Sequence, residues 1–290
     1  MSQIIHSLSD VSDRYKALFV DLWGCVHDGV KAMPAAVKAL QEYRAKGGIV
    51  VLVTNSPRAR VGVEKQLKTF GVPDDAWDTI ATSGDSARSA MFQGVVGQKV
   101  YFIGEERDLP FFEPLSLLDN PVEITRVPLA EADGIVCTGP FDSLADPEDM
   151  RGPFLLAKTN GLKLLCANPD IVVDRGHVRE WCAGALAQLY TEMGGESLYF
   201  GKPHPPIYDL ARRRLYALDG DIQDDQILAI GDGILTDIKG AVGENIDSLF
   251  ITGGLAAADT KTQEQPDPEA LERYLAQEMM SPTYSIGFLR

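Results

Sequence analysis

Cysteine is scarce in this 290-residue chain. The four cysteines, Cys25, Cys137, Cys166 and Cys182, are scattered and form no Cys-x-x-Cys pair. This spacing argues against both a disulfide framework and a cysteine-based zinc site, because each needs cysteines at regular, matched spacings. We therefore expect buried, reduced thiols in a cytoplasmic protein.

Long apolar runs and positive charge are also lacking. No stretch approaches the roughly 18 apolar residues of a membrane span, and the first residues show no signal-peptide pattern. The 27 lysines and arginines are outnumbered by 42 acidic residues, which gives a formal net charge of −15. Such a surface repels nucleic acid and anionic membranes. The expected partners are small soluble molecules, with no nucleic acid and no membrane.

Short apolar runs are abundant, and they alternate with helical patterns. The runs are rich in β-branched residues and do not alternate with polar ones, which is typical of strands covered on both faces. Strand–helix alternation predicts an α/β fold with a doubly wound parallel sheet. The predicted strands are 17–20, 48–53, 100–103, 134–137, 162–166, 198–200, 226–230 and 248–251, and the predicted helices are 34–46, 60–70, 179–193, 206–218 and 268–279.

Three of these strands fall in one long stretch between the second and the sixth strand of the series. The simplest account is a discontinuous core domain of residues 1–84 and 196–290, interrupted by an inserted α/β cap domain of residues 85–195. Ligands of open parallel sheets bind beyond the carboxyl ends of the strands. A cap would therefore lie over the ligand crevice and set substrate selectivity.

Acidic residues follow two of the predicted core strands. Asp21 comes directly after KALFV, and Asp232 and Asp237 follow QILAIG. A carboxylate on a sharp turn after a strand can act as a nucleophile or as a metal ligand. Mg²⁺ prefers oxygen ligands and commonly takes one or two carboxylates. Each segment alone could equally be a capped turn, but together they indicate a magnesium site.

Polar residues follow two further strands. Thr54 and Asn55 in LVTNSPR could bind a phosphoryl group through neutral hydrogen bonds. Lys202 in GKPHPPIY lies between a glycine and a proline, which restricts its backbone and could aim its ammonium group at developing negative charge. Four strand ends that carry such residues predict one phosphoryl-transfer crevice.

The segments DLWG, LVTNSPR, GKPHPPIY and GDGILTDI resemble, in order and spacing, the four motifs of the haloacid dehalogenase (HAD) superfamily. The large insert between the second and third motifs is similar to the C2-type cap of subfamily IIA, which includes phosphatases of pyridoxal phosphate, phosphoglycolate, nucleotides and 4-nitrophenyl phosphate. The segments SGDSARSAM, VYFIGEE and LCANPD also resemble that class, so the likeness covers nearly the whole chain. It implies a Rossmann-like core and a Mg²⁺-dependent phosphatase acting on a small phosphorylated metabolite, such as a sugar phosphate, a nucleotide or an aryl phosphate.

The resemblance implies a role for each motif residue. Asp21 would attack phosphorus to form an aspartyl-phosphate, and Mg²⁺ would be held by Asp21, the backbone carbonyl of Trp23, Asp232 and the nearby Asp237. The remaining motif residues would act on the phosphoryl group: Thr54, Asn55 and Lys202 would bind it, and Lys202 would also neutralise its charge.

The first motif departs from the family pattern at Trp23, where the phosphatases carry a second aspartate that serves as general acid and base. An indole cannot transfer a proton in either half-reaction. General acid–base catalysis typically contributes about 10²–10⁴-fold, so the sequence predicts slowed or redirected turnover. His27 and Asp28 in the same loop could supply a substitute proton donor, or they could be ordinary residues of a solvent-facing loop.

Three functions remain open at this stage. The first is a phosphatase that favours good leaving groups. The second is a phosphotransferase with a long-lived phosphoenzyme, and the third is a catalytically impaired regulatory protein that binds a phosphometabolite. The segment 170–179 is expected to be a charged cap loop that reads the substrate or simply faces solvent. A monomer and a homodimer are both compatible with the sequence.

Overall fold

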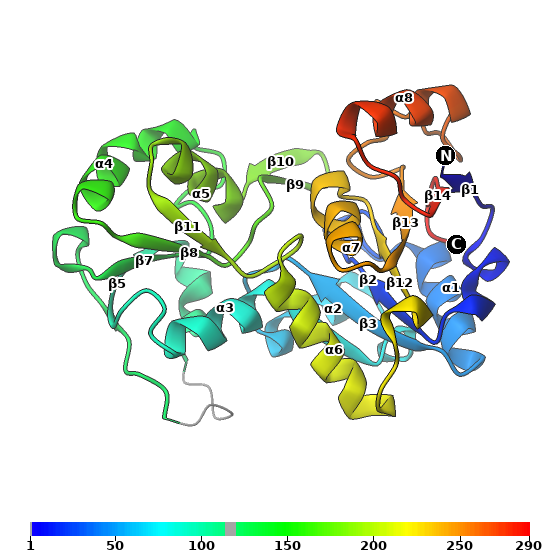
Figure 1. Ribbon diagram of the computed structural model, residues 1–290, viewed down its shortest axis with the longest axis horizontal. Coiled ribbons are helices and arrows are strands. Elements are labelled where there is room, and N and C mark those ends of the chain that lie inside the picture. Colours follow the sequence, from blue (N-terminus) through cyan, green and yellow to red (C-terminus); the bar gives the residue numbers. More distant parts are fainter. Residues whose placement is uncertain (1, 114–119) are drawn as a thin grey trace. The chain divides into compact units, whose positions relative to one another are not determined.

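A computed structural model describes residues 2–113 and 120–290 of the chain (Figure 1). The chain divides into two compact units. Unit 1 comprises Met1–Thr54, Glu64–Ala81 and Tyr208–Arg290, and unit 2 comprises Asn55–Val63 and Thr82–Ile207. Each unit contains its own parallel sheet, so the predicted α/β fold with a second, inserted α/β unit is confirmed.

The sheet of unit 1 has seven strands in the order β1-β14-β13-β12-β2-β3-β4. Every neighbouring pair whose register is known is parallel. The strands are β1 (Gln3–Ile4), β2 (Ala17–Val20), β3 (Ile49–Thr54), β4 (Thr79–Thr82), β12 (Ile227–Gly231), β13 (Asp247–Ile251) and β14 (Tyr284–Ile286). The helices are α1 (Pro34–Ala45), α2 (Arg60–Phe70), α6 (Pro205–Asp219), α7 (Lys239–Gly243) and α8 (Pro268–Glu278), with α2 and α6 crossing between the units along the chain.

The central strands of unit 1 are buried along their whole length, as their continuous apolar sequences predict. Every residue of β2 and β12 is buried, which requires cover on both faces of the sheet. One part of this cover packs residues of α8 and of the π-helical turn η8 (Ile234–Ile238) against Phe250 of β13. The core of unit 1 therefore holds the carboxyl ends of β2 and β12 in fixed register.

Unit 2 is a three-layer structure around a five-stranded sheet in the order β11-β8-β7-β5-β6. Successive side chains along a strand point to opposite faces of the sheet and join two different hydrophobic clusters. Ile135 and Cys137 pack against α4 and α5 on one face, whereas Val136 packs against α3 on the other. Figure 1 shows α4 and α5 on one side of this sheet and α3 on the other. The elements are α3 (Ser83–Phe92), β5 (Lys99–Ile103), β6 (Thr125–Arg126), β7 (Gly134–Cys137), α4 (Arg151–Thr159), β8 (Lys163–Cys166), α5 (Ala183–Glu192) and β11 (Glu196–Tyr199).

A β-hairpin replaces the loop predicted at residues 170–179 and the first turn of the helix predicted at 179–193. Strands β9 (Val172–Arg175) and β10 (Val178–Trp181) pair antiparallel, with Arg179 opposite Asp174. The two side chains form a bidentate ion pair with both distances at 2.8 Å. Cross-strand pairing thus takes residues 178–181 out of helix α5, which begins at Ala183.

The segment 55–63 belongs to unit 2, although the sequence interpretation placed it in the core domain. Its turn is tied to α3, because the backbone N–H of Gly84 donates to the carbonyl of Ser56 at 3.0 Å. A side chain at Gly84 would collide with the carbonyl oxygens of Pro57 and Arg58, at 2.2 and 2.5 Å from a Cβ atom. This close approach fixes the segment onto unit 2.

The four cysteines all lie in the described ranges, where they are buried and form no disulfide bond. None of the helices in the described ranges combines the length and the apolar character that a bilayer crossing needs.

Candidate active site

The register of the unit 1 sheet brings the first and fourth motifs to one edge. Val20 of β2 lies opposite Ile230 of β12, and the backbone N–H of Asp21 donates to the carbonyl of Ile230 at 2.8 Å. Asp21 and Asp232 therefore leave neighbouring parallel strands at the same end. Thr54 ends β3 at this edge too and is buried.

A compact group of ligand atoms results. Asp21, Asp232 and Cys25 each offer one atom, and these atoms lie within 4.8 Å of one another. Both carboxylates are only 7 % exposed, and Cys25 is fully buried. Two buried like charges at this separation repel each other unless a cation lies between them. The oxygen pair fits Mg²⁺, whereas a thiol is a poor ligand for that ion.

Asp232 is held in place by backbone groups and by two glycines. The N–H of Leu255 donates to its Oδ2 atom at 3.1 Å. A Cβ atom at Gly254 or Gly24 would lie 1.9 or 2.2 Å from the same oxygen. Asp237 is fixed in a similar way, since the N–H of Gly233 donates to its Oδ2 atom at 3.1 Å. The backbone thus orients both carboxylates of the fourth motif.

Replacing Gly24 by alanine should weaken Mg²⁺ binding in addition to lowering the stability of the protein. Gly24 has a φ of +71°, so alanine costs about 1–2 kcal/mol in backbone strain, and its methyl group would also displace the Asp232 carboxylate. Gly47 is a matched control, because its φ is +91° and nothing lies within 4 Å of an added Cβ atom. We expect Mg²⁺ to raise the melting temperature of Gly47→Ala as in the wild type, and much less in Gly24→Ala. Equal shifts in the two variants would contradict this role of Gly24.

Trp23 packs into the loop that follows Asp21. Its indole ring covers the backbone of Gly29, where an added Cβ atom would lie 2.2 Å from the ring, and it meets the His27 ring edge-on with centroids 5.2 Å apart. His27 in turn packs against Phe70 at 4.9 Å. The indole therefore belongs to a small aromatic cluster that shapes this loop.

The two residues considered as substitute proton donors are both engaged within the loop. His27 is fully buried, and its Nδ1 atom accepts a hydrogen bond from the N–H of Gly29 at 3.1 Å. The Nδ1 atom therefore carries no proton that it could donate. Backbone N–H groups of Lys31 and then Val30 hold the pKa of the Asp28 carboxyl below its usual value. Asp28 is consequently ionised at neutral pH and carries no proton to donate.

The remaining motif residues lie in unit 2, where Asn55 and Lys202 form one hydrogen-bonded pair. The side-chain oxygen of Asn55 accepts from the N–H of Lys202 at 2.7 Å, and its amide nitrogen donates to the Lys202 carbonyl at 3.1 Å. The same nitrogen donates to Asp170 Oδ1 at 2.8 Å. Gly201 permits this approach, because a Cβ atom there would lie 2.4 Å from the Asn55 oxygen. Lys202 itself is buried.

Replacing Asn55 by aspartate should destabilise unit 2. A carboxylate keeps the acceptor for the Lys202 N–H but loses both donors, and it places a second negative charge beside Asp170. We expect a loss of about 2–3 kcal/mol in the free energy of unfolding, measured by urea denaturation. Asn160→Asp, at the exposed end of α4, is the control and should change this free energy by less than about 0.5 kcal/mol. Similar losses in both variants would refute the role of the Asn55 amide.

Sequence reasoning missed several residues of these two groups. Cys25 lies four residues after Asp21. Only the folded loop shows that its sulfur lies close to the carboxylates of Asp21 and Asp232. Asp170 is 115 residues from Asn55 in the chain, so no local pattern could pair them. Of the two glycines that crowd Asp232, Gly24 lies in the first motif and Gly254 lies outside the motifs, and the sequence shows the packing partner of neither.

The chain also matches known proteins along most of its length. Residues 18–115 match the haloacid dehalogenase-like hydrolase family, and residues 199–276 match the HAD-hydrolase-like family. A hydrolase of the haloacid dehalogenase-like family from Brucella suis 1330 is 40% identical, with a TM-score of 0.86. The match covers 99% of this chain and 100% of that one. The chain belongs to the haloacid dehalogenase-like hydrolase family.

Proteins that match this chain at lower identity include several named as phosphatases or nucleotidases. The 5'-nucleotidase YutF of Bacillus subtilis is 26% identical over 88% of this chain and 93% of its own length. Phosphoglycolate phosphatase 1A of Arabidopsis thaliana is 26% identical over 88% of this chain and 74% of its own. A p-nitrophenyl phosphatase from Archaeoglobus fulgidus shares the fold, with a TM-score of 0.68 at 19% identity over 94% of this chain and 96% of that one. Together these matches indicate subfamily IIA and the activity class of a phosphomonoester hydrolase.

Proposed function

We propose that the protein is a Mg²⁺-dependent phosphatase of small phosphorylated metabolites that works through an aspartyl-phosphate at Asp21. The observation that carries the proposal is the pair of buried carboxylates, Asp21 and Asp232, at the aligned ends of β2 and β12. The nucleotidase, phosphoglycolate phosphatase and glycerol 3-phosphate phosphatase names among its relatives support the substrate class. The inserted unit would act as the cap domain.

The first half-reaction needs a nucleophile and charge neutralisation. A carboxylate oxygen of Asp21 attacks phosphorus, and the bond from phosphorus to the leaving oxygen breaks, with its electron pair passing to that oxygen. Thr54 and Asn55 would bind the phosphoryl oxygens, and the Lys202 ammonium would offset their negative charge. Mg²⁺, held by Asp21, Asp232, the Trp23 carbonyl and the nearby Asp237, would neutralise charge on the phosphoryl group.

The second half-reaction lacks an evident base. Water must attack the aspartyl-phosphate and lose a proton, but Trp23 can neither donate nor accept one. The proposal assigns no replacement, since His27 is buried in the aromatic cluster and Asp28 is held as an anion by backbone N–H groups. A long-lived phosphoenzyme, and hence phosphoryl transfer to an acceptor other than water, is the second candidate function that Trp23 favours.

Leaving groups that need no protonation test the proposal directly. With Mg²⁺, single-turnover rate constants should be much larger for 4-nitrophenyl phosphate and acetyl phosphate than for ethyl phosphate. Treatment with EDTA should abolish the hydrolysis of all three substrates. Acid quenching during turnover should trap a phosphorylated protein. Equal rate constants for the aryl and alkyl esters would show that a proton donor is present after all.

A further inference from the structure

Cys25 is a buried thiol that the proposed reaction does not use. Its sulfur lies with the carboxylate oxygens of Asp21 and Asp232 in one group, whose ligand atoms are all within 4.8 Å of one another. The three side chains belong to unit 1 and are buried. Among the residues that the structure describes, no other three acidic, cysteine or histidine side chains come this close. The proposed Mg²⁺ site therefore has a sulfur atom beside its two carboxylates.

The loop after β2 holds Cys25 at this place. The N–H of His27 donates to the carbonyl of Leu22 at 3.1 Å, and the carbonyl of His27 accepts from the N–H of Gly24 at 3.0 Å. These two bonds close the chain around Cys25 into a tight loop. Gly24 also packs against Asp232, since a Cβ atom at Gly24 would lie 2.2 Å from the Oδ2 atom of that carboxylate. The backbone that carries the thiol is therefore fixed beside Asp232.

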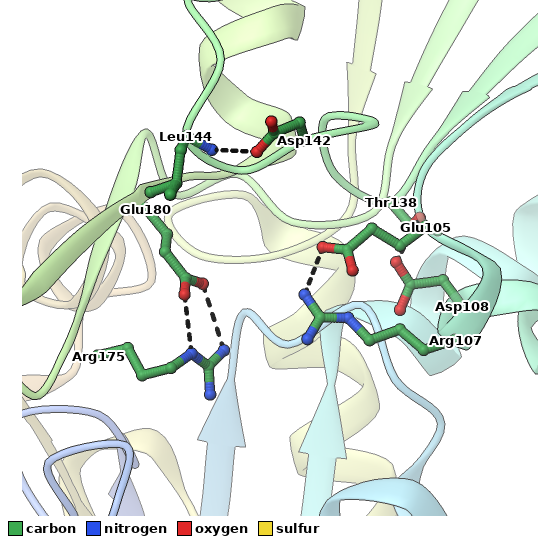
Figure 2. A network of polar contacts seen from close by, with 8 residues as sticks. All are labelled: Glu105, Arg107, Asp108, Thr138, Asp142, Leu144, Arg175 and Glu180. Atoms are coloured by element: carbon green, nitrogen blue, oxygen red, sulfur yellow. Dashed lines mark hydrogen bonds and ion pairs between the residues drawn. The ribbon is translucent and has the colours of Figure 1, made fainter.

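The acidic residues of the polar network in unit 2 are placed differently. Figure 2 shows Glu105 bound to Arg107 and Glu180 bound to Arg175. A guanidinium group already neutralises each of these glutamates through charge-assisted hydrogen bonds, which leaves little attraction for a metal ion. We therefore expect a metal ion to bind to the carboxylates of unit 1 rather than to those of this network.

Two carboxylates and one sulfur suit a different class of cation from Mg²⁺. Thiolate ligands select borderline and soft ions, whereas Mg²⁺ takes oxygen ligands. Zn²⁺ binds sulfur at about 2.3 Å and carboxylate oxygen at about 2.0–2.2 Å, commonly with three protein ligands and one open position. Ligand atoms that share one tetrahedral ion at these distances are about 3.3–3.7 Å apart. The three atoms, which are within 4.8 Å of one another, need to move together by roughly 1–1.5 Å at most to reach that spacing.

We propose that Asp21, Cys25 and Asp232 form an inhibitory site for thiophilic divalent cations such as Zn²⁺ and Cd²⁺, which exclude Mg²⁺. The inhibitory role rests on the proposed phosphatase function. The thiol proton passes to solvent as the sulfur–metal bond forms. Three anionic ligands around a divalent ion leave a net charge of −1, whereas Mg²⁺ between the two carboxylates is neutral. The occupied site therefore repels a phosphate ester that the Mg²⁺ site accepts.

Cd²⁺ tests the site without turnover, because a cadmium–thiolate bond absorbs in the ultraviolet. The first equivalent of Cd²⁺ added to the metal-free wild type should produce this charge-transfer band. Cys25→Ser should lack the band, whereas Cys182→Ser, at a buried thiol of unit 2, should keep it. Asp232→Asn retains all four thiols and should bind Cd²⁺ about tenfold to a hundredfold more weakly than the wild type. This last variant keeps the test valid even if Cys25→Ser folds poorly.

The response to Mg²⁺ separates the sulfur from the oxygen ligands. Mg²⁺ should raise the melting temperature of Cys25→Ser as much as that of the wild type, because both carboxylates remain. The dissociation constants of Zn²⁺ and Cd²⁺ should rise by about tenfold to a hundredfold in this variant. With 4-nitrophenyl phosphate at a fixed Mg²⁺ concentration, the Zn²⁺ concentration for half-inhibition should rise by the same factor.

The outcomes distinguish this inference from the proposed function. An equally strong band in Cys25→Ser, or no band in a wild type that hydrolyses 4-nitrophenyl phosphate with Mg²⁺, would overturn the thiophilic site and leave the phosphatase proposal intact. If the band depended on Cys25 and Asp232 but Mg²⁺ supported no hydrolysis of any ester, the cation site would stand. Only its inhibitory role would then fall, together with the phosphatase proposal.

Discussion

Asp21→Asn should reduce the turnover of 4-nitrophenyl phosphate by at least about 10³-fold, because an amide cannot attack phosphorus as a carboxylate does. The same change removes one of two buried carboxylates whose ligand atoms lie within 4.8 Å of each other and of Cys25. It should therefore relieve repulsion in the metal-free protein. We expect a melting temperature without Mg²⁺ that is equal to or higher than that of the wild type.

The metal response distinguishes this loss from misfolding. A ligand that binds only the folded state stabilises it in proportion to the logarithm of its concentration over its dissociation constant. Mg²⁺ should thus raise the melting temperature of the wild type more than that of Asp21→Asn. Acid quenching should trap phosphate on the wild type and none on the variant. Phosphoenzyme formed by Asp21→Asn would place the nucleophile elsewhere.

The core strands and most of the motif residues could be predicted from sequence because their signals are local. The strands at Ala17–Val20 and Gly134–Cys137 occur with the predicted bounds. Both are continuous apolar runs bounded by polar or turn residues, and burial of both faces leaves few alternatives. Polar residues directly after such runs fall at the carboxyl edge of a parallel sheet. The meeting of Asp21 and Asp232 at one edge follows from this topology.

Features that depend on distant partners could not be predicted. The hairpin at Val172–Trp181 is short and charged, so its sequence gives no clear strand signal. Its pairing becomes evident only in the structure, where Arg175 and Arg179 each form an ion pair with a residue of the opposite strand. The edge strand β1 and its neighbour β14 have only two and three residues and pair residues about 280 positions apart in the chain. Asn55 likewise joins unit 2 through Lys202 and Asp170, both more than 100 positions away.

Trp23→Asp is the variant with the largest expected gain. An aspartate at this position would supply the proton donor and base that the loop lacks, and such a group typically contributes about 10²–10⁴-fold. It should raise the rate for ethyl phosphate far more than the rate for 4-nitrophenyl phosphate, because only the alkyl leaving group needs a proton. It should also shorten the lifetime of the phosphoenzyme, measured by acid quenching after the substrate is exhausted.

Loss of the indole complicates a comparison of Trp23→Asp with the wild type. Trp23 covers Gly29 and packs against His27, and removing a fully buried aromatic ring costs about 3–5 kcal/mol. The half-buried Trp23 should cost less, but the loop will loosen. Trp23→Asn has the same size and the same lost packing without an ionisable group. The ethyl phosphate rate of the aspartate variant should exceed that of the asparagine variant by about 10²–10⁴-fold. Equal rates would mean that the missing carboxyl group does not limit this enzyme, and that the aromatic cluster itself sets the rate through the shape of the loop.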